Sequence, residues 1–343
     1  MTSSGRSRKQ LTLVVIGLVV LVLIFAVVLP RFANYGDVWR VLTSMKPGWL
    51  IALGAAEIAN LGTYAPNWMA ALPGLRYRQS LELTMAGTAI ANVAPLGGPV
   101  SMTMQYGMLR QWGFARRDSS RAMVLTGIWN NLLNLSLPVV ALVVLTAKGG
   151  KNAALAAAAR IGAPLIVLGV VGFIAVMRSE RAGDVVGGWA DRTANVIRRV
   201  RRRPPSAGAA SAIHAFRADS VDLIRRRWLA LTVGTLVGVM TMFVVFVICI
   251  RGLDITGQSI TFTEAFAAWA ISRLLSSIPL TPGGLGIIEV GLTSALTAFG
   301  ADQASAVAAV LLYRLLTWLP PILLGGVAAL TWRRNHSSVQ ASV

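Results

Sequence analysis

The chain has 343 residues, of which 55% are hydrophobic and 13% are charged, and its formal net charge is +19. Apolar runs of about 20 residues, the length that crosses a bilayer, recur along it, so we predict an all-α, polytopic membrane protein. The basic residues lie between these runs, where membrane orientation accounts for them, and we therefore expect no nucleic-acid partner.

Six apolar runs are predicted to cross the membrane completely. The first, residues 11–29, follows a short basic cytoplasmic tail (1–10), and its length favours an uncleaved span over a signal peptide. The other five are expected to be uninterrupted spans, at residues 49–72, 121–146, 153–177, 228–250 and 305–332. Together they define a single transmembrane domain over residues 11–332, followed by a tail at 333–343.

Two further apolar stretches are predicted to be re-entrant helical hairpins. Residues 81–112 are broken by Pro95-Leu96-Gly97-Gly98-Pro99, and each arm reaches only about 20 Å of a hydrocarbon core about 30 Å thick. Residues 262–299 are broken in the same way around Pro282 to Gly286, although two tilted crossings remain an alternative there. Hydrocarbon tolerates open backbone only where protein or water covers it, so these breaks mark candidate working sites.

The distribution of basic residues supports this topology. When both hairpins return to their own side, most of the 32 lysine and arginine residues lie in segments on the inside. Basic segments stay preferentially in the cytoplasm, so we expect both termini there, with the protein in a bacterial cytoplasmic (inner) membrane.

The two halves of the transmembrane domain, residues 11–147 and 153–332, share an order of features. In each half a span beginning Trp-Leu leads to a hairpin with paired glycines, then to another glycine and a span containing proline. The residues are Trp49, Gly97-Gly98, Gly113 and Pro138 in one half, and Trp228, Gly283-Gly284, Gly300 and Pro320 in the other. The hairpins open to opposite sides, which is the inverted repeat of secondary transporters. Chance similarity is the alternative, because glycine and proline are common in membrane helices.

The second hairpin carries a motif that resembles a known family. The stretch Ser276-Ser277-Ile278-Pro279-Leu280-Thr281, the run PGGLGIIEVGL at 282–292 and Tyr313-Arg314-Leu315-Leu316 before Pro320 are similar to the C-terminal signature of the lysylphosphatidylglycerol synthase transmembrane family. The resemblance extends over residues 11–332 and implies a flippase-like lipid translocase, similar to the flippase half of the multiple peptide resistance factor.

The resemblance is weaker at the first hairpin. Many family members carry a charged residue after the glycines, where this chain offers Ser101, Thr103 and Gln105. The linker at 178–227 leaves no room for the soluble aminoacyltransferase domain that the lysyl-transferring enzyme needs. The resemblance therefore implies translocation without synthase activity.

Charged residues at membrane depth, together with the second hairpin turn, form the main candidate site for substrate binding. Its members are Arg273, Pro282, Gly283, Gly284, Gly286, Glu289 and Arg314. Because a charge at the centre of a spanning helix costs about 2.5–3.5 kcal/mol, these side chains should pair or face water. Our hypothesis is that the arginines and the glycine amides hold a phosphate-bearing headgroup, while Glu289 binds a cationic part of it or a coupling proton. A buried structural ion pair between Glu289 and an arginine is the alternative.

Secondary candidates lie in the first half of the chain. They are Glu57, Asn92, Gly97, Gly98, Gln105 and Asn130. For the polar amides among them, headgroup contact and interhelical hydrogen bonding are equal alternatives.

The cytoplasmic linker at 178–227 is strongly basic. Apolar residues recur at near-helical spacing from Val185 to Val200 beside several arginines, until Pro204-Pro205 ends the pattern. This pattern predicts an amphipathic helix lying on the anionic lipid of the inner leaflet. Charge that serves only to fix orientation is the alternative.

The sequence favours transport over catalysis. It has no Gly-x-x-x-x-Gly-Lys-Ser/Thr phosphate loop, its histidines His214 and His336 lie in the linker and the tail, and its single cysteine, Cys249, lies in an apolar run. We therefore expect no enzyme activity, metal site or cofactor. The predicted function is translocation of a polar membrane lipid of the phospholipid or polyprenyl-phosphate type. The alternative is a non-transporting scaffold for a lipid or cell-wall glycosyltransferase.

Overall fold

The computed structural model describes residues 36, 39–40 and 43–340, apart from 95–96, 148–152, 201–207, 254–259 and 277–281. The described residues form helices and turns and contain no β-strand. In chain order the elements are α3 (Pro47–Gly62), α4 (Ala65–Ala71), α5 (Tyr77–Val93), α6 (Gly97–Gln111), α7 (Arg116–Ala147), α8 (Ala153–Arg178), α9 (Glu180–Val200), α10 (Ala209–Gly252), α11 (Phe262–Ser276), the 3₁₀ helix η4 (Pro282–Gly284), α12 (Ile287–Ala298) and α13 (Gln303–Gln340). The predicted tail at 1–10 and first span at 11–29 lie outside the described residues.

Long apolar helices dominate the fold. Among the described residues, three segments are long and apolar enough to cross a membrane: Arg116–Ala147, Ser211–Gly252 and Gln303–Ala328. They contain the predicted spans at 121–146 and 228–250 and most of the one at 305–332, and α8 coincides with the span predicted at 153–177. These lengths and compositions make the chain a multi-pass membrane protein.

The span predicted as uninterrupted at 49–72 is broken, so that prediction is wrong. Helix α3 ends at Gly62, and α4 begins at Ala65 after the turn at Thr63 and Tyr64. The cause is Pro66, whose ring would clash with the carbonyl of Gly62 in a continuous helix, whereas the first turn of a new helix accommodates it.

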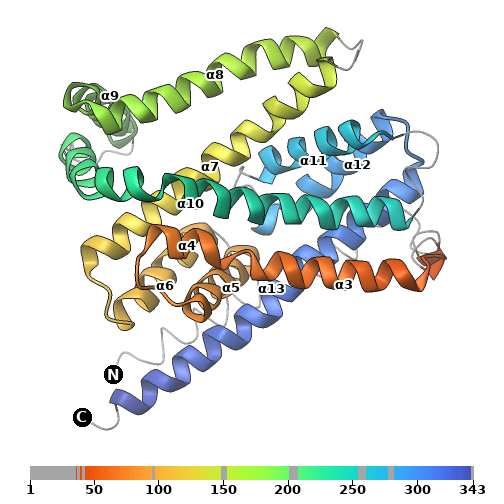
Figure 1. Cartoon of the computed structure of the whole chain (residues 1–343), viewed down its shortest axis with the longest axis horizontal. Coiled ribbons are helices and arrows are strands. Elements are labelled where there is room, and N and C mark those ends of the chain that lie inside the picture. The colour runs from red at the N-terminus through yellow and green to blue at the C-terminus, as the bar shows by residue number, and fades with distance from the viewer. Residues whose placement is uncertain are drawn as a thin grey trace.

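Two pairs of neighbouring helices form hairpins. Helices α5 and α6 pack together as the first hairpin, and α11 and α12, with η4 between them, pack as the second. In Figure 1 the α6–α7 turn, α9 and the end of α13 lie toward one end of the molecule, while the start of α3 and the α12–α13 turn lie toward the other. The two hairpins therefore enter the helix assembly from opposite ends.

Both hairpins end in the same local structure. At the end of α6 the Phe114 amide donates to the Leu109 carbonyl at 3.2 Å, and at the end of α12 the Ala301 amide donates to the Leu296 carbonyl at 3.1 Å. Each bond spans six residues around a glycine with positive φ, which is the Schellman motif that closes a helix. The long helices α7 and α13 follow these turns directly.

Each hairpin packs into its own hydrophobic cluster. Leu83, Met108 and Leu125 belong to the cluster around the first hairpin. Phe246 and Trp269 belong to the cluster around the second, which is rich in aromatic rings.

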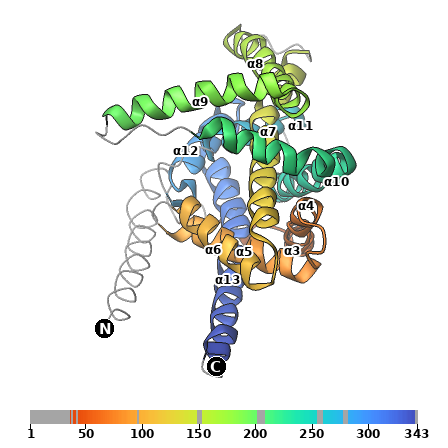
Figure 2. The same ribbon diagram turned by 90° about the vertical axis from the view of Figure 1, so that its left-hand side faces the viewer.

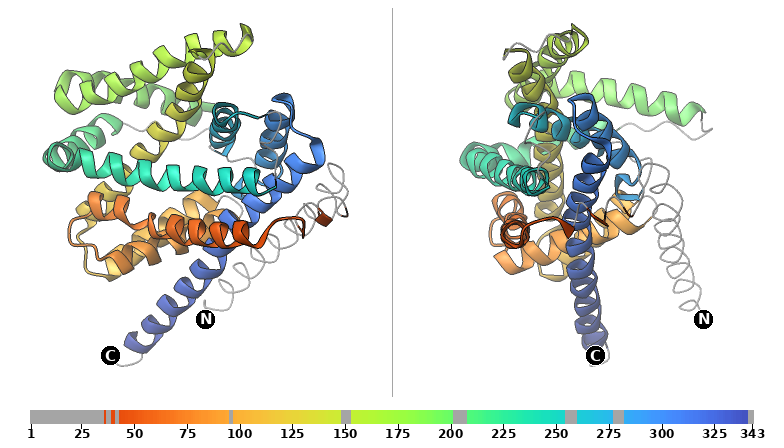
Figure 3. Two further views of the ribbon diagram at one scale, coloured as in Figure 1. Left: turned by 45° about the vertical axis from the view of Figure 1, so that its right-hand side comes forward. Right: turned by 90° about the vertical axis from the view of Figure 1, so that its right-hand side faces the viewer.

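Helix α13 connects the two clusters. It runs past α12 and then crosses α5 (Figure 3), where a Cβ on Gly325 would lie 2.1 Å from the Met85 carbonyl oxygen. The two backbones therefore approach as closely as glycine allows, which fixes the position of the first hairpin relative to the helix that follows the second.

The basic linker is largely helical. Helix α9 covers the predicted amphipathic segment, and α10 begins at Ala209, well before the predicted span at 228–250. The start of α10 packs against α9. His214 Nε2 lies 2.6 Å from Asp184 Oδ1, and Arg217 Nη1 lies 3.0 Å from Glu180 Oε1. Figure 2 shows α9 running across the end of the molecule.

Candidate functional site

The turn of the second hairpin is built by glycine. Gly283, Gly284 and Gly286 have φ angles of 61°, 68° and 83°, a region that side-chain-bearing residues rarely adopt, and Pro282 opens the turn as the first residue of η4. Helix α12 begins directly afterwards at Ile287. The turn thus presents backbone N–H and C=O groups at the positive end of α12.

An ion pair closes this turn. The Arg314 Nε donates to Glu289 Oε1 at 2.6 Å; Glu289 is buried and Arg314 is half-buried. The second carboxylate oxygen accepts the Gly286 amide at 2.7 Å, while Arg314 Nη2 donates to the Gly283 carbonyl at 2.8 Å. The pair therefore ties α12 and α13 to the turn, with both charges satisfied by charge-assisted hydrogen bonds.

This arrangement differs from the predicted phosphate cradle in one respect. The Gly286 amide already donates to Glu289, and it cannot also bind a lipid phosphate while that bond persists. The ion pair that sequence analysis held as the alternative is the one that the structure contains.

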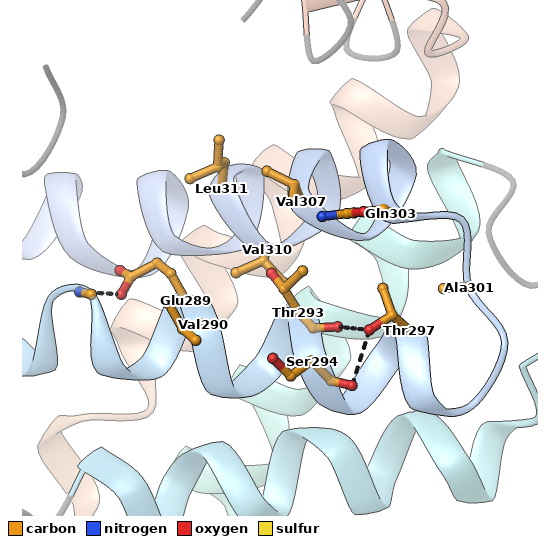
Figure 4. A pocket seen from close by; sticks show the side chains of 11 residues that line it. Glu289, Val290, Thr293, Ser294, Thr297, Ala301, Gln303, Val307, Val310 and Leu311 are labelled. Carbon is orange, nitrogen blue, oxygen red and sulfur yellow. Dashed lines mark hydrogen bonds between the residues drawn. The ribbon is translucent and has the colours of Figure 1, made fainter. Parts of the chain in front are cut away.

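A pocket with both polar and apolar lining residues extends from Glu289 between α12 and α13. It has a volume of about 410 Å³, and its polar lining residues include Thr293, Thr297 and Gln303 (Figure 4). Glu289, Thr293 and Thr297 are spaced by four residues and lie on one face of α12. Sequence analysis overlooked the two threonines, although their spacing from Glu289 was a readable signal.

Arg273 lies in a different pocket. Its Nε and Nη2 donate to Asn134 Oδ1 at 3.3 and 3.1 Å, which connects α11 to α7. The pocket has a volume of about 250 Å³, and Asn67 and Asn130 line it with Arg273. The structure therefore divides the predicted primary residues between two polar sites.

The first hairpin touches the second hairpin turn through Asn92. A Cβ on Gly283 would lie 3.2 Å from Asn92 Oδ1 and 2.7 Å from Trp318 Nε1. The Trp318 indole N–H is buried and has no hydrogen-bond acceptor among the described residues. A buried donor without an acceptor is costly, so this N–H is a further candidate for contact with a ligand.

The remaining secondary candidates lie away from the ion pair. Gln105 donates to the Leu83 carbonyl at 3.2 Å inside the first hairpin, and Gly97 packs against the last turn of α5. Gly98 is exposed. Glu57 is buried on α3, and neither of its carboxylate oxygens has a hydrogen-bond partner in the described part of the chain.

The described residues contain no cluster of three or more His, Cys, Asp and Glu side chains that could hold a metal ion. The polar groups at the two pockets are instead guanidinium, carboxylate, amide and hydroxyl groups. These are suited to binding a headgroup with phosphate and cationic parts.

Comparison with known proteins matches most of the chain to one family model and shorter segments to individual relatives. The model of the family described as the lysylphosphatidylglycerol synthase TM region matches residues 14–325. The UPF0104 membrane protein MJ1078 of Methanocaldococcus jannaschii is 39% identical over 64 residues, which cover 19% of this chain and 27% of that protein. The UPF0104 membrane protein PH1989 of Pyrococcus horikoshii is 36% identical over 78 residues, 23% of each chain. The chain thus aligns with about a quarter of the length of these curated relatives.

Proposed function

This chain belongs to the lysylphosphatidylglycerol synthase transmembrane family, and we propose that it translocates a polar, phosphate-bearing lipid across the cytoplasmic membrane. The observation that carries the proposal is the Glu289–Arg314 ion pair, whose carboxylate is buried and lines a pocket. Ionisable residues at membrane depth are expensive and are usually functional, and here a space for a polar group lies beside them.

The ion pair suits a headgroup that carries both charges. A phosphate oxygen can replace the carboxylate on Arg314, because guanidinium binds both groups through paired N–H donors. Glu289 is then available to a cationic part of the same headgroup or to a proton. Since each charge exchanges one partner for another, the exchange avoids leaving a charge buried and unpaired.

The pocket at Arg273 provides a second contact for the headgroup in this proposal. Asn130 and Asn67 supply neutral donors and acceptors there, and the Asn67 Oδ1 has no hydrogen-bond partner among the described residues. A phospholipid or a polyprenyl phosphate offers phosphate oxygens to such a site, with its chains left in the hydrocarbon. The chemistry is binding and movement, and we propose no covalent step and no enzyme activity.

We further infer that the protein crosses the membrane six times, with α3 and α4 together forming one broken span, and has two re-entrant hairpins in inverted halves, as expected for alternating access. The entry of the hairpins from opposite ends supports this arrangement (Figure 1). The arginine-rich helix α9 lies at the same end as the α6–α7 turn, and the positive-inside rule then places both termini in the cytoplasm of a bacterium.

Helix α9 is proposed to lie on the anionic inner leaflet. Val185, Val186, Trp189 and Val196 are all exposed on this helix, so its apolar face points away from the rest of the protein. An apolar face beside arginines is the composition of a helix that lies in the lipid headgroup region.

Reconstitution of the purified full chain in liposomes tests the proposal. Acyl-labelled phosphatidylglycerol, phosphatidylethanolamine and polyprenyl phosphate should each be assayed by bleaching of the outer-leaflet label. We expect at least one to move faster than in protein-free liposomes, and Glu289→Gln to slow it about ten-fold or more, because Arg314 then lacks its partner.

The controls are Asp222→Asn and Arg251→Gln, which neutralise exposed charges away from both pockets and should leave the rate unchanged. If none of the three lipids moves faster than in empty liposomes, translocation of these lipid classes is excluded. The scaffold for a glycosyltransferase would then become the favoured function.

A further inference from the structure

A second, separate groove lies on the side of the molecule. Helices α7, α8 and α10 enclose a groove of about 900 Å³, within the range of small-molecule sites. None of the residues at the Glu289 pocket lines it. In Figure 1, α7 passes between α8 and α10, which are otherwise separate over most of their lengths.

The walls of the groove are mostly apolar. Its apolar lining residues include Leu132 on α7, Phe173 on α8 and Ile224 on α10. The Trp129 and Phe173 rings meet edge to face with centroids 5.7 Å apart, and Trp129 Nε1 donates to Thr232 Oγ1 at 3.0 Å. Because the indole N–H already has an acceptor, this part of the wall offers a ligand mainly apolar surface.

One end of the groove is basic. Arg178, Arg217 and Arg225 line it. Arg217 is already occupied, since it donates to Glu180 at 3.0 Å and to the Met177 carbonyl at 3.2 Å. The side chains of Arg178 and Arg225 are exposed, and among the described residues neither forms an ion pair, so the positive charge available at this end lies on them.

The arginines lie at the ends of the spanning segments, and the apolar wall lies along the spanning part of the helices. Arg178 is the last residue of α8, and Arg225 precedes the apolar part of α10, which begins at Trp228. Tryptophan and arginine at the ends of spanning segments mark the lipid headgroup level. From Arg225 to Thr232 the groove extends about 10 Å along α10, which is the direction that an acyl chain would take from that level.

We propose that this groove binds one anionic phospholipid of the leaflet beside α9, with its phosphate at Arg178 and Arg225 and one acyl chain along α7 and α8. The basic end selects an anionic headgroup, and the apolar wall selects a lipid over a soluble phosphate. This site is independent of the translocation proposed above, because it shares no residue with the Glu289 and Arg273 pockets.

Native mass spectrometry of the purified full chain measures the binding directly. The probes are dioleoyl phosphatidylglycerol and dioleoyl phosphatidylcholine at equal concentration, with glycerol phosphate as the soluble anion. We expect phosphatidylglycerol to be retained preferentially and glycerol phosphate not to be retained. The double variant Arg178→Gln/Arg225→Gln should weaken phosphatidylglycerol binding about 25-fold, since each arginine near anionic lipid contributes about five-fold.

The matched control is Arg181→Gln/Arg226→Gln, which removes the same charge from exposed neighbours that do not line the groove. It should leave the preference unchanged. Equal loss in both double variants would show nonspecific surface attraction and would overturn the proposal, as would equal retention of the two lipids or retention of glycerol phosphate. The fold by which Arg178→Gln/Arg225→Gln weakens phosphatidylglycerol retention should be the same in the natural chain and in a Glu289→Gln background, because neither arginine lines the Glu289 pocket, so failure of one proposal is distinguishable from failure of the other.

Discussion

The two hairpins use the same glycine pair for different purposes. In the first hairpin, Gly97 begins a helix, and a Cβ there would lie 2.4 Å from the Ala91 carbonyl oxygen. In the second, Gly283 and Gly284 adopt positive φ and form a turn between helices. Gly97 thus permits close packing of α5 and α6, whereas Gly283 and Gly284 permit a backbone shape that places polar groups around Glu289.

The two hairpins also differ in the charge of their polar groups. Among the described residues, most side-chain hydrogen bonds of the first hairpin are formed by uncharged groups, such as the bond from Gln105 to the Leu83 carbonyl. The second hairpin holds a buried carboxylate, Glu289, which lines a pocket and pairs with the half-buried guanidinium of Arg314 on α13. A glycine pair alone therefore does not distinguish the two hairpins, whereas the ionisable groups beside Gly283 and Gly284 do.

The substitution with the largest expected effect tests whether the Glu289–Arg314 ion pair is needed for translocation as well as for stability. Arg314→Gln should lower the free energy of unfolding by about 3–5 kcal/mol, because Glu289 is left buried without its partner. Glu289→Gln/Arg314→Gln should recover most of that loss, since a neutral pair can hydrogen-bond in the same place. Denaturant unfolding in micelles and lipid translocation in liposomes should be measured on the same preparations. Recovery of stability without recovery of translocation fits our proposal, whereas recovery of both would reduce the pair to a structural element.

The outline of the fold could be predicted from the sequence because it depends on local pattern. Apolar length fixed α7 and α8 to within a few residues at most boundaries, and the proline and glycine runs located both hairpin turns. The break before Pro66 was missed, because proline is also tolerated inside membrane helices and the surrounding residues are apolar.

The candidate site was only partly predictable. Glu289, Arg273 and Arg314 could each be identified as charges at membrane depth. Which arginine pairs with Glu289 depends on the faces that α11 and α13 turn toward α12, and these are set by packing between distant segments. Sequence spacing does not contain that information, so Arg273 was grouped with a pair from which the structure separates it.

A second test concerns the packing glycine of the first hairpin. Gly97→Ala should lower the free energy of unfolding by about 1–3 kcal/mol, because the new methyl group overlaps a backbone carbonyl that cannot rotate away. The adjacent Gly98→Ala is the matched control, since a Cβ there meets nothing within 4 Å. Equal effects of the two substitutions on denaturant unfolding would contradict the packing role assigned to Gly97.

The turn glycine of the second hairpin should respond for a different reason. A Cβ on Gly286 would meet nothing within 4 Å, yet its φ is 83°. Gly286→Ala should therefore cost about 1–2 kcal/mol through backbone strain alone. If the strain displaces the amide that binds Glu289, translocation should fall as well. The control Gly98→Ala adds a methyl group to helical backbone and should change neither the free energy of unfolding nor the translocation rate. If Gly286→Ala also changed neither quantity, the turn would tolerate a side chain at this φ and the strain argument would be wrong.

The smallest expected effect lies where the second hairpin continues into α13. The Ser305 amide donates to Asp302 Oδ2 at 3.0 Å, and this bond lowers the pKa of the Asp302 carboxyl. Asp302→Ala should cost about 1 kcal/mol at pH 7, the usual value of a helix N-cap. Because the folded pKa is depressed, this contribution is present above the unfolded pKa of about 4 and is lost as the pH falls through the folded value. The stability difference between the natural chain and Asp302→Ala should accordingly shrink below pH about 4. Asp302→Asn keeps an oxygen acceptor that does not titrate, so its stability relative to Asp302→Ala should not change with pH; a parallel pH dependence in both comparisons would assign the effect to another group.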